Sequence, residues 1–303
     1  METQPTGRQT ERPTGEGSLT RASSASAAGV GPREFFHNRF VYAVISQRAR
    51  GLSIGVNLNP DRECNFDCVY CEVDRARPIR DRIVDPAVVA AELKEMLGLV
   101  ENGGFGRLRG YEAVPPELLV LKEVALSGDG EPTLCPNFVE VVEAVIHVRA
   151  QAGFPFFKIV LITNGTGLDR PEVQAGLKLL TLRDEVWAKV DAGTQAFMDQ
   201  INRSSVPLRQ VLDNILALAR ARPVVIQSLF ALVDGHPPPP NEIEEYALRL
   251  RELKEAGAQI PLVQVYSAHR PAVRKSCDHL PLRSLSQIAR RVRDVSGLRA
   301  EVF

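Results

Sequence analysis

The sequence has no excess of charge of either sign and no long apolar run. Its 303 residues contain 37 Lys plus Arg and 37 Asp plus Glu, so net charge indicates neither a nucleic-acid nor a membrane partner. No uninterrupted apolar segment approaches the roughly 20 residues of a transmembrane helix. The amino terminus also lacks the apolar stretch of a signal peptide. These absences predict a cytoplasmic protein without a membrane partner.

Cysteine is scarce as well, with five residues in the whole chain. That number is too low for a disulfide framework, and three of the five lie within eight residues, at Cys64, Cys68 and Cys71. Thiolates this close in sequence can reach one small metal centre, which favours a reducing compartment and metal chemistry. The other two, Cys135 and Cys277, are isolated and are interpreted as ordinary buried thiols.

Large apolar residues are nearly missing from residues 1–34, which are rich in Thr, Gly, Pro, Ser and Ala. Such a segment cannot bury enough surface to offset the entropy of ordering it, so we expect a disordered tail. The folded domain is predicted to span residues 35–303.

Six strand-like segments alternate with helical patterns through this domain. Asp85 followed by Pro86 predicts one helix start, and Asn241 predicts another. The alternation predicts an α/β fold, an incomplete (β/α)6 barrel with its core at about 52–268 and a C-terminal helical extension at 269–303. The strands are expected near residues 52–58, 118–126, 157–162, 185–190, 224–233 and 260–266.

Chemically distinctive residues follow several of these strands. In such folds the carboxyl ends of the strands meet at one site. The cysteine loop, the segment 127–132, Thr163 with Asn164, Asp191 and the segment 267–270 should therefore converge there.

The cysteine triplet has three interpretations. Three buried thiols would not cluster in this way to satisfy packing. Structural zinc needs four ligands, and the distant donors would be Cys277, His269 and His279. An iron–sulfur cluster is favoured, because four-iron cages usually take four cysteines and a triplet leaves one iron open to a small molecule.

A second motif is Ser127-Gly-Asp-Gly-Glu-Pro-Thr-Leu134, whose glycines allow the backbone to approach a ligand. Here Glu131 could accept hydrogen bonds from a cationic amine, although the segment could also be a simple turn. Thr163-Asn164 and Lys189-Val-Asp191 are ambiguous between ligand contacts and turn chemistry. Buried Gln227 and Gln264 each need a polar partner, either structural or a ligand.

The spacing Cys64-x3-Cys68-x2-Cys71, with Tyr70 before the last cysteine, resembles the signature of the radical S-adenosylmethionine (radical SAM) superfamily. Gly130-Glu131, and less closely Gly128, resemble its Gly-Gly-Glu motif. The segments Asn57–Arg62, Ser127–Thr133 and Gln264–Ser267 are similar to a branch related to the wyosine-base synthases of tRNA.

The resemblance implies that Cys64, Cys68 and Cys71 hold a 4Fe-4S cluster. It places Gly128, Gly130 and Glu131 at the amino group of S-adenosylmethionine, and Tyr70 beside its adenine or the cluster. Thr163, Asn164, Lys189 and Asp191 would contact its ribose and carboxylate. Reductive cleavage would give a 5′-deoxyadenosyl radical that abstracts hydrogen from a substrate.

The partners implied by the resemblance are a flavodoxin-like or ferredoxin-like electron donor and a substrate that could be RNA or a partner protein. Eight Lys or Arg against three Asp or Glu after residue 269 could meet an anionic substrate or form a solvated basic face. Two alternative functions remain open at this stage, an activase that makes a glycyl radical on a partner protein and a non-catalytic zinc or iron–sulfur module.

Overall fold

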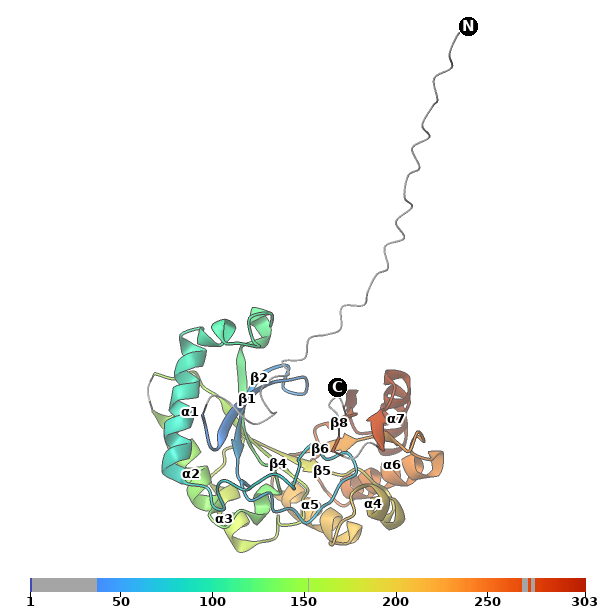
Figure 1. Cartoon of the computed structure of the whole chain (residues 1–303). Helices are drawn as coiled ribbons and strands as arrows, with labels where there is room; N and C mark the ends of the chain where they lie inside the picture. Colours follow the sequence, from blue (N-terminus) through green and yellow to red (C-terminus); the bar gives the residue numbers. More distant parts are fainter. Residues whose placement is uncertain (2–36, 152, 269–271, 274–275) are drawn as a thin grey trace.

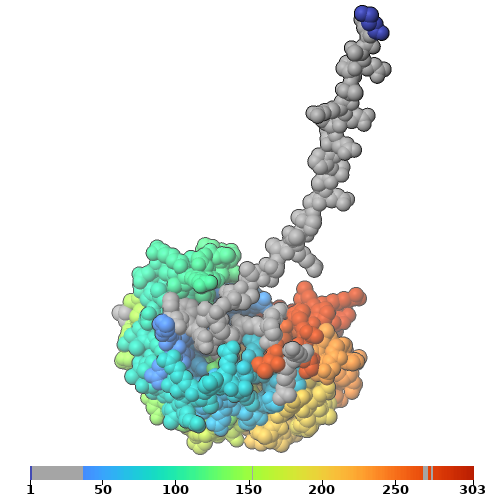
Figure 2. Space-filling view, in the orientation of Figure 1, coloured from blue at the N-terminus to red at the C-terminus, as the bar shows by residue number. Residues whose placement is uncertain are grey.

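The computed structural model describes residue 1 and residues 37–151, 153–268, 272–273 and 276–303. Apart from Met1, the predicted tail lies outside these residues, as do His269 and Arg270. Figure 1 shows a sheet that curls into an open half-barrel, with the helices on its outer side. Figure 2 shows one face of the molecule, with the segments coloured blue to green and those coloured orange to red at its two sides.

The main sheet has eight strands in the order β1-β2-β3-β4-β5-β6-β8-β10. Strand β1 is antiparallel to β2, and all the other neighbours are parallel. The six predicted parallel strands are therefore confirmed. The bounds are β1 Val41–Ser46, β2 Gly51–Asn57, β3 Leu121–Ser127, β4 Lys158–Thr163, β5 Glu185–Lys189, β6 Val224–Leu229, β8 Val263–Tyr266 and β10 Ala300–Val302.

Seven α-helices and three short 3₁₀ turns accompany the strands in the described part of the chain. Helix α1 begins as predicted, because the Asp85 carboxylate accepts hydrogen bonds from the amides of Ala87 and Val88. The helices are α1 Pro86–Glu101, α2 Phe138–Ala150, α3 Pro171–Lys178, α4 Gln195–Ile201, α5 Leu208–Ala221, α6 Pro240–Glu255 and α7 Leu282–Ser296; the turns are Gly104–Arg107, Pro116–Leu118 and Pro132–Leu134.

The structure differs from the sequence-based expectations at four places. Strand β1, at the edge of the main sheet, was not expected. The run 224–233 is not one strand, because it breaks at Phe230 and its end, β7 (Ala231–Val233), pairs with β9 (Cys277–His279) in a separate small sheet. The segment after residue 268 is not only helical, since β10 extends the main sheet beside β8. Helix α6 begins at Pro240 with Pro239 as its N-cap, so Asn241 is not the cap.

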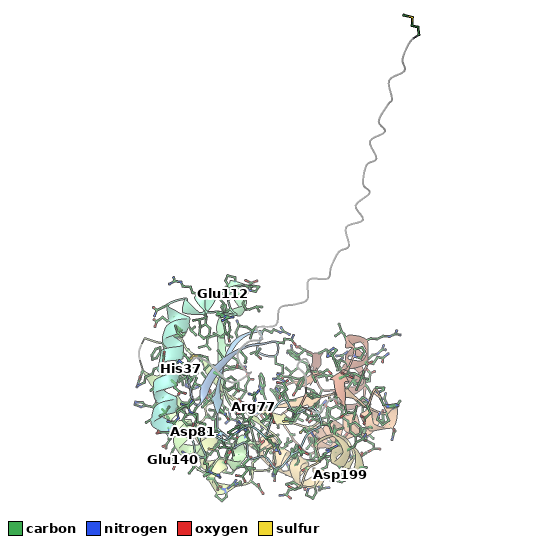
Figure 3. All side chains as sticks on the ribbon, viewed as in Figure 1. His37, Arg77, Asp81, Glu112, Glu140 and Asp199 are labelled. Atoms are coloured by element: carbon green, nitrogen blue, oxygen red, sulfur yellow. The ribbon has the colours of Figure 1, made fainter. Side chains whose placement is uncertain are left out.

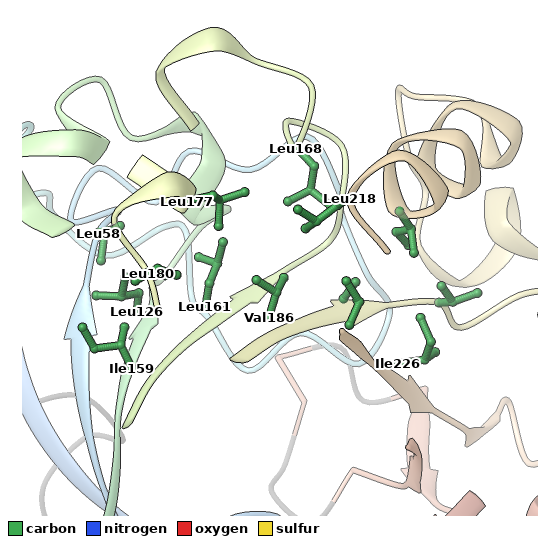
Figure 4. Packing of buried hydrophobic residues seen from close by; sticks show 14 of the residues in the cluster. Leu58, Leu126, Ile159, Leu161, Leu168, Leu177, Leu180, Val186, Leu218 and Ile226 are labelled. Carbon is green, nitrogen blue, oxygen red and sulfur yellow. The ribbon is translucent and has the colours of Figure 1, made fainter. Parts of the chain in front are cut away.

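The main core fills the space between the sheet and the outer helices. Leu126, Leu161 and Ile226 are fully buried there, and Figure 4 shows them packed with Leu168 and Leu177 from the segments that follow β4. A smaller cluster of Val160, Trp187 and Val225 is separate from this core. Strands covered on both faces carry continuous apolar runs, which explains why the sequence pattern located these strands well.

The parallel register aligns the ends of the strands. Asn57 of β2 lies opposite Ser127 of β3, and Lys189 of β5 lies opposite Gln227 of β6. The cysteine loop and the glycine-rich segment begin directly after the first pair, so both leave the sheet at the same edge.

Candidate active site

A pocket of about 470 Å³ opens where the carboxyl ends of the strands meet, a size within the usual range for small-molecule sites. It is lined by residues from the cysteine loop, the glycine-rich segment and the ends of β4 and β5. Of the eleven predicted site residues, ten line it: Tyr70, Cys64, Cys68, Cys71, Gly128, Gly130, Glu131, Thr163, Asn164 and Lys189. Asp191 is buried and does not line it.

The cysteine loop is fixed by backbone hydrogen bonds to two other segments. Asp67 and Val69 donate to the carbonyls of Asn202 and Ile201, each at 2.9 Å. On the opposite side, the amide of Glu131 donates to the carbonyl of Glu63 at 2.8 Å. The loop therefore has a defined position relative to the glycine-rich segment before any ligand is considered.

The segment after the third cysteine folds back over this loop. Arg75 donates to the carbonyl of Phe66 at 2.6 Å, and Arg39 forms an ion pair with Asp81 at 2.5 Å. Figure 3 labels Arg77 and Asp81 on this segment. These contacts connect the end of the cysteine loop to the start of the domain.

Polar groups reach two of the three sulfurs. The amide of Phe66 donates to Cys64 Sγ at 3.4 Å, and Asn164 Nδ2 lies 3.9 Å from the same sulfur. On the other side of the loop, Asn202 Nδ2 donates to Cys68 Sγ at 3.5 Å. Hydrogen bonds to the sulfurs are one of the means by which proteins set the potential of iron–sulfur centres. The donor set of three thiols with N–H groups at two of them fits a cluster of this kind.

Burial raises the pKa of Cys64 to about 12 and also raises the pKa of Cys68. A thiol with such a pKa is protonated at neutral pH, whereas a metal ligand is a thiolate. Metal binding at these sulfurs must therefore release protons.

Within the described residues, no group of three or more His, Cys, Asp or Glu side chains converges tightly enough to hold a single metal ion. The cysteines of an iron–sulfur cluster need no such convergence, because they bind different irons. Cys277 and His279 do not line the pocket, although Cys277 packs in a buried cluster with Val69 and Tyr70 of the cysteine loop. His279 Nδ1 lies 3.3 Å from the carbonyl of Ala268. His269 is outside the described residues.

Gly130 allows close packing between the two motifs. A Cβ atom at this position would lie 1.8 Å from the carbonyl oxygen of Glu63, directly before Cys64. At Gly128 a Cβ would approach the side chain of Asn59 to 2.6 Å. At both positions the neighbouring protein atoms leave no room for a Cβ, and both glycines line the pocket.

Glu131 is buried and its carboxylate is occupied by the protein itself. It accepts hydrogen bonds from Thr133, from the Thr163 hydroxyl and from the amide of Asn164. Burial raises the pKa of this carboxyl, and the hydrogen bonds oppose that effect. Through these hydrogen bonds Glu131 orients the end of β4, and it also lines the pocket.

Asp191 is likewise an internal anchor. Its carboxylate accepts hydrogen bonds from Tyr70 Oη, from Asn202 Nδ2 at 2.9 Å and from the amide of Leu229 at 2.8 Å. Burial, followed by the charge of Asp191, raises the pKa of Tyr70 well above its ordinary value. Tyr70 is thus held as a neutral phenol at the wall of the pocket.

Lys189 lies between these groups. Its Nζ is 3.7 Å from Asp191 Oδ2 and 4.6 Å from the centre of the Tyr70 ring. Burial is the largest single influence and lowers the pKa of Lys189, but the charges of Asp191, Tyr266 and Cys68 together outweigh burial and the net shift is upward. Lys189 therefore presents a permanent cation to the pocket.

Sequence reasoning missed Asn202, which donates to Cys68 Sγ, Tyr70 Oη and Asp191. It follows α4 without any motif around it, so only the fold identifies it. The two glutamines that needed polar partners contact each other: Gln227 Nε2 donates a hydrogen bond to Gln264 Oε1 at 3.2 Å.

A half-open parallel barrel with three cysteines and a glycine-rich turn at one pocket defines a class of cofactor-dependent enzymes. The model of the radical SAM superfamily matches residues 58–253, and the chain belongs to that superfamily. It is an enzyme of this class, and the cofactors of the class are a 4Fe-4S cluster and S-adenosylmethionine.

Individual relatives are distant. A UPF0026 protein of Helicobacter pylori is 23% identical over 265 residues, which cover 82% of this chain and 78% of the relative. A structure of TYW1 with a bound lysine–pyruvate adduct is 20% identical with a TM-score of 0.51, covering 82% of this chain and 74% of that one. A radical SAM methyltransferase from Sphaerobacter thermophilus is 14% identical with a TM-score of 0.61, covering 87% and 68%. These structures share the fold.

In the described part of the chain, no helix combines the length and the apolar character needed to cross a bilayer.

Proposed function

We propose that this protein cleaves S-adenosylmethionine reductively and uses the resulting radical to remove a hydrogen atom from a substrate. The observation that supports this most directly is the hydrogen bond between the amide of Glu131 and the carbonyl of Glu63, which joins the cysteine loop to the glycine-rich turn at one pocket. Membership of the superfamily favours this catalytic role over a metal-binding module without activity.

In this proposal Cys64, Cys68 and Cys71 hold three irons of a 4Fe-4S cluster. When bound, the cluster would supply a one-electron reduction of S-adenosylmethionine, with the electron coming from a flavodoxin-type or ferredoxin-type donor. The expected products are methionine and 5′-deoxyadenosine, the latter carrying the hydrogen atom removed from the substrate.

The residues of the chain bind and orient the reactants. The glycine-rich turn at Gly128 and Gly130 brings backbone to the pocket wall, and Glu131 holds Thr163 and Asn164 in place beside it. Lys189 supplies a cation for the cofactor carboxylate, and Tyr70 forms an apolar wall whose hydroxyl is held by Asp191. Asp191 therefore acts as a positioning residue.

The test is anaerobic reconstitution with iron and sulfide, followed by reduction in the presence of S-adenosylmethionine. We expect about four irons per chain and formation of 5′-deoxyadenosine, with product formation lost in Cys68→Ala. Cys135→Ala is a matched control, since that thiol is buried outside the pocket and should leave product formation unchanged. One zinc per chain without iron, or product formation that survives Cys68→Ala, would refute the proposal.

A further inference from the structure

One cation in the pocket has no role in the assignments above. Arg48 lies in the turn between β1 and β2, and its side chain reaches the far part of the sheet, where the guanidinium carbon is 4.5 Å from the ring centre of Tyr266 on β8. Both residues line the pocket. Arg48 thus enters the site from the β1 edge of the sheet, which is the edge far from β8 in the strand order.

The guanidinium of Arg48 makes no hydrogen bond or ion pair with any described residue; the ring of Tyr266 is its one close partner there. Contact with an aromatic face fixes a guanidinium without using its N–H donors, which lie in its plane. Its neighbour Arg50 differs, because it is exposed and forms an ion pair with Glu301 at 3.2 Å. Arg48 is therefore a half-buried, oriented cation with unused donors.

The charges around Arg48 leave room for an anion. Lys189 faces the same pocket, and the charge of Arg48 acts to lower the pKa of Lys189. The charge of Arg48 also acts to lower the pKa of the Glu123 carboxyl. Glu123, however, accepts its hydrogen bond from Ser53 at 3.1 Å and forms its ion pair with Lys158 at 4.0 Å. Lys189 is paired with Asp191 at 3.7 Å, whereas Arg48 forms no ion pair with a carboxylate among the described residues.

We propose that Arg48 binds the carboxylate or phosphate of a small-molecule substrate. The planar fork of arginine suits either oxyanion, and the ring of Tyr266 keeps the fork in place. A small molecule is favoured over RNA, because Arg48 is half-buried in a pocket of about 470 Å³ that the proposed function also assigns to the cofactor. The inference rests on the proposed function, since it places the substrate beside the same cofactor.

The experiment measures anion binding directly, on reconstituted enzyme loaded with S-adenosylmethionine. Isothermal titration uses lactate as the carboxylate probe and inorganic phosphate as the phosphate probe, with Arg48→Gln, Arg48→Lys and the matched control Arg50→Gln. We expect at least one probe to bind, with about tenfold or more weaker binding in Arg48→Gln, because hydrogen bonds to charged groups are lost. Arg48→Lys should be intermediate, and Arg50→Gln within about twofold of wild type.

The probe that binds identifies the anion class. The inference is overturned if neither probe binds, if Arg48→Gln binds as wild type does, or if that variant loses affinity for S-adenosylmethionine instead. It is also overturned if bulk tRNA binds in an Arg48-dependent way while both probes fail. Thermal melting and iron content confirm that each variant folds. Failure of 5′-deoxyadenosine formation would refute the proposed function alone, because anion binding is measured without turnover.

Discussion

The substitution Gly130→Ala tests whether close contact between the two motifs builds the site. The new Cβ would lie 1.8 Å from the Glu63 carbonyl oxygen, 2.7 Å from its carbonyl carbon and 2.9 Å from the Asn59 Cβ. The two nearest atoms belong to the backbone and cannot rotate away, so either the turn or the cysteine loop must move. The move also strains the hydrogen bond from the Glu131 amide to Glu63.

The expected cost follows from these two losses. Overpacking of this kind costs about 1–3 kcal/mol, and a lost hydrogen bond about 1 kcal/mol more. For a domain of this size, a loss of about 3 kcal/mol corresponds to a melting temperature roughly 5–10 °C lower. Because Glu63 directly precedes Cys64, the displacement should also reduce the iron bound per chain on reconstitution.

The assays are thermal melting of the apo chain and iron and sulfide analysis after reconstitution. Gly98→Ala is the matched control: it lies in helix α1, and a Cβ there meets no atom within 4 Å. Alanine favours a helix interior, so this control should be neutral or more stable by up to about 1 kcal/mol. A Gly130→Ala chain that melts as wild type does and binds full iron would refute the reasoning.

Two further substitutions follow from the buried carboxylates. Asp191→Asn should lower 5′-deoxyadenosine formation by about tenfold or more, because Tyr70 and Lys189 lose the anion that they contact. The control is Asp199→Asn at an exposed position (Figure 3), which should change stability by less than about 0.5 kcal/mol. Equal activities of the two variants would contradict the role of Asp191. Asp184→Asn should destabilise the fold by about 2–4 kcal/mol, since Arg149 is left buried without its partner. Burial tends to raise the pKa of Asp184, but the hydrogen bonds from Arg149, Ile159 and Thr181 outweigh it and the net shift is downward. This group therefore stabilises the fold above its ordinary pKa of 3.8, and the stabilisation is lost as the pH falls through the lower folded value. Chemical denaturation between about pH 2 and 5 should show this loss of stability on acidification in wild type and a smaller loss in Asp184→Asn, whereas identical curves would contradict the assignment.

The sequence predicted the sheet well for a physical reason. Strands covered on both faces consist of continuous apolar runs, so six of the seven parallel strands could be recognised and the residues at their ends placed at one edge. Strand β10 was missed because three residues are too few to show a strand-like hydrophobic pattern, and their pairing with β8 is a tertiary contact. The break at Phe230 was hidden because β6 and β7 form a single apolar run although they belong to different sheets.

The sequence identified residues that line the pocket, but it identified fewer of the residues that contact them. Local spacing identifies Cys64, Cys68 and Cys71, because a loop can bring them to one pocket without distant chain. Asn202 reaches Cys68 and Tyr70, and Arg48 reaches the pocket, only through the folding of segments far from the cysteine loop. No local pattern distinguishes such an asparagine or arginine from one on the surface.

The two carboxylates of the predicted site, Glu131 and Asp191, both accept hydrogen bonds from the protein itself. Each is almost fully buried and accepts hydrogen bonds from at least three groups of the protein. A carboxylate removed from water is stable only when its oxygens are satisfied, and here protein donors satisfy them. Among those donors, Thr163, Asn164 and Tyr70 line the pocket. The carboxylates therefore fix the direction of the residues that a ligand would meet. Replacing either one should disturb cofactor binding through its neighbours, even though neither oxygen needs to touch the cofactor.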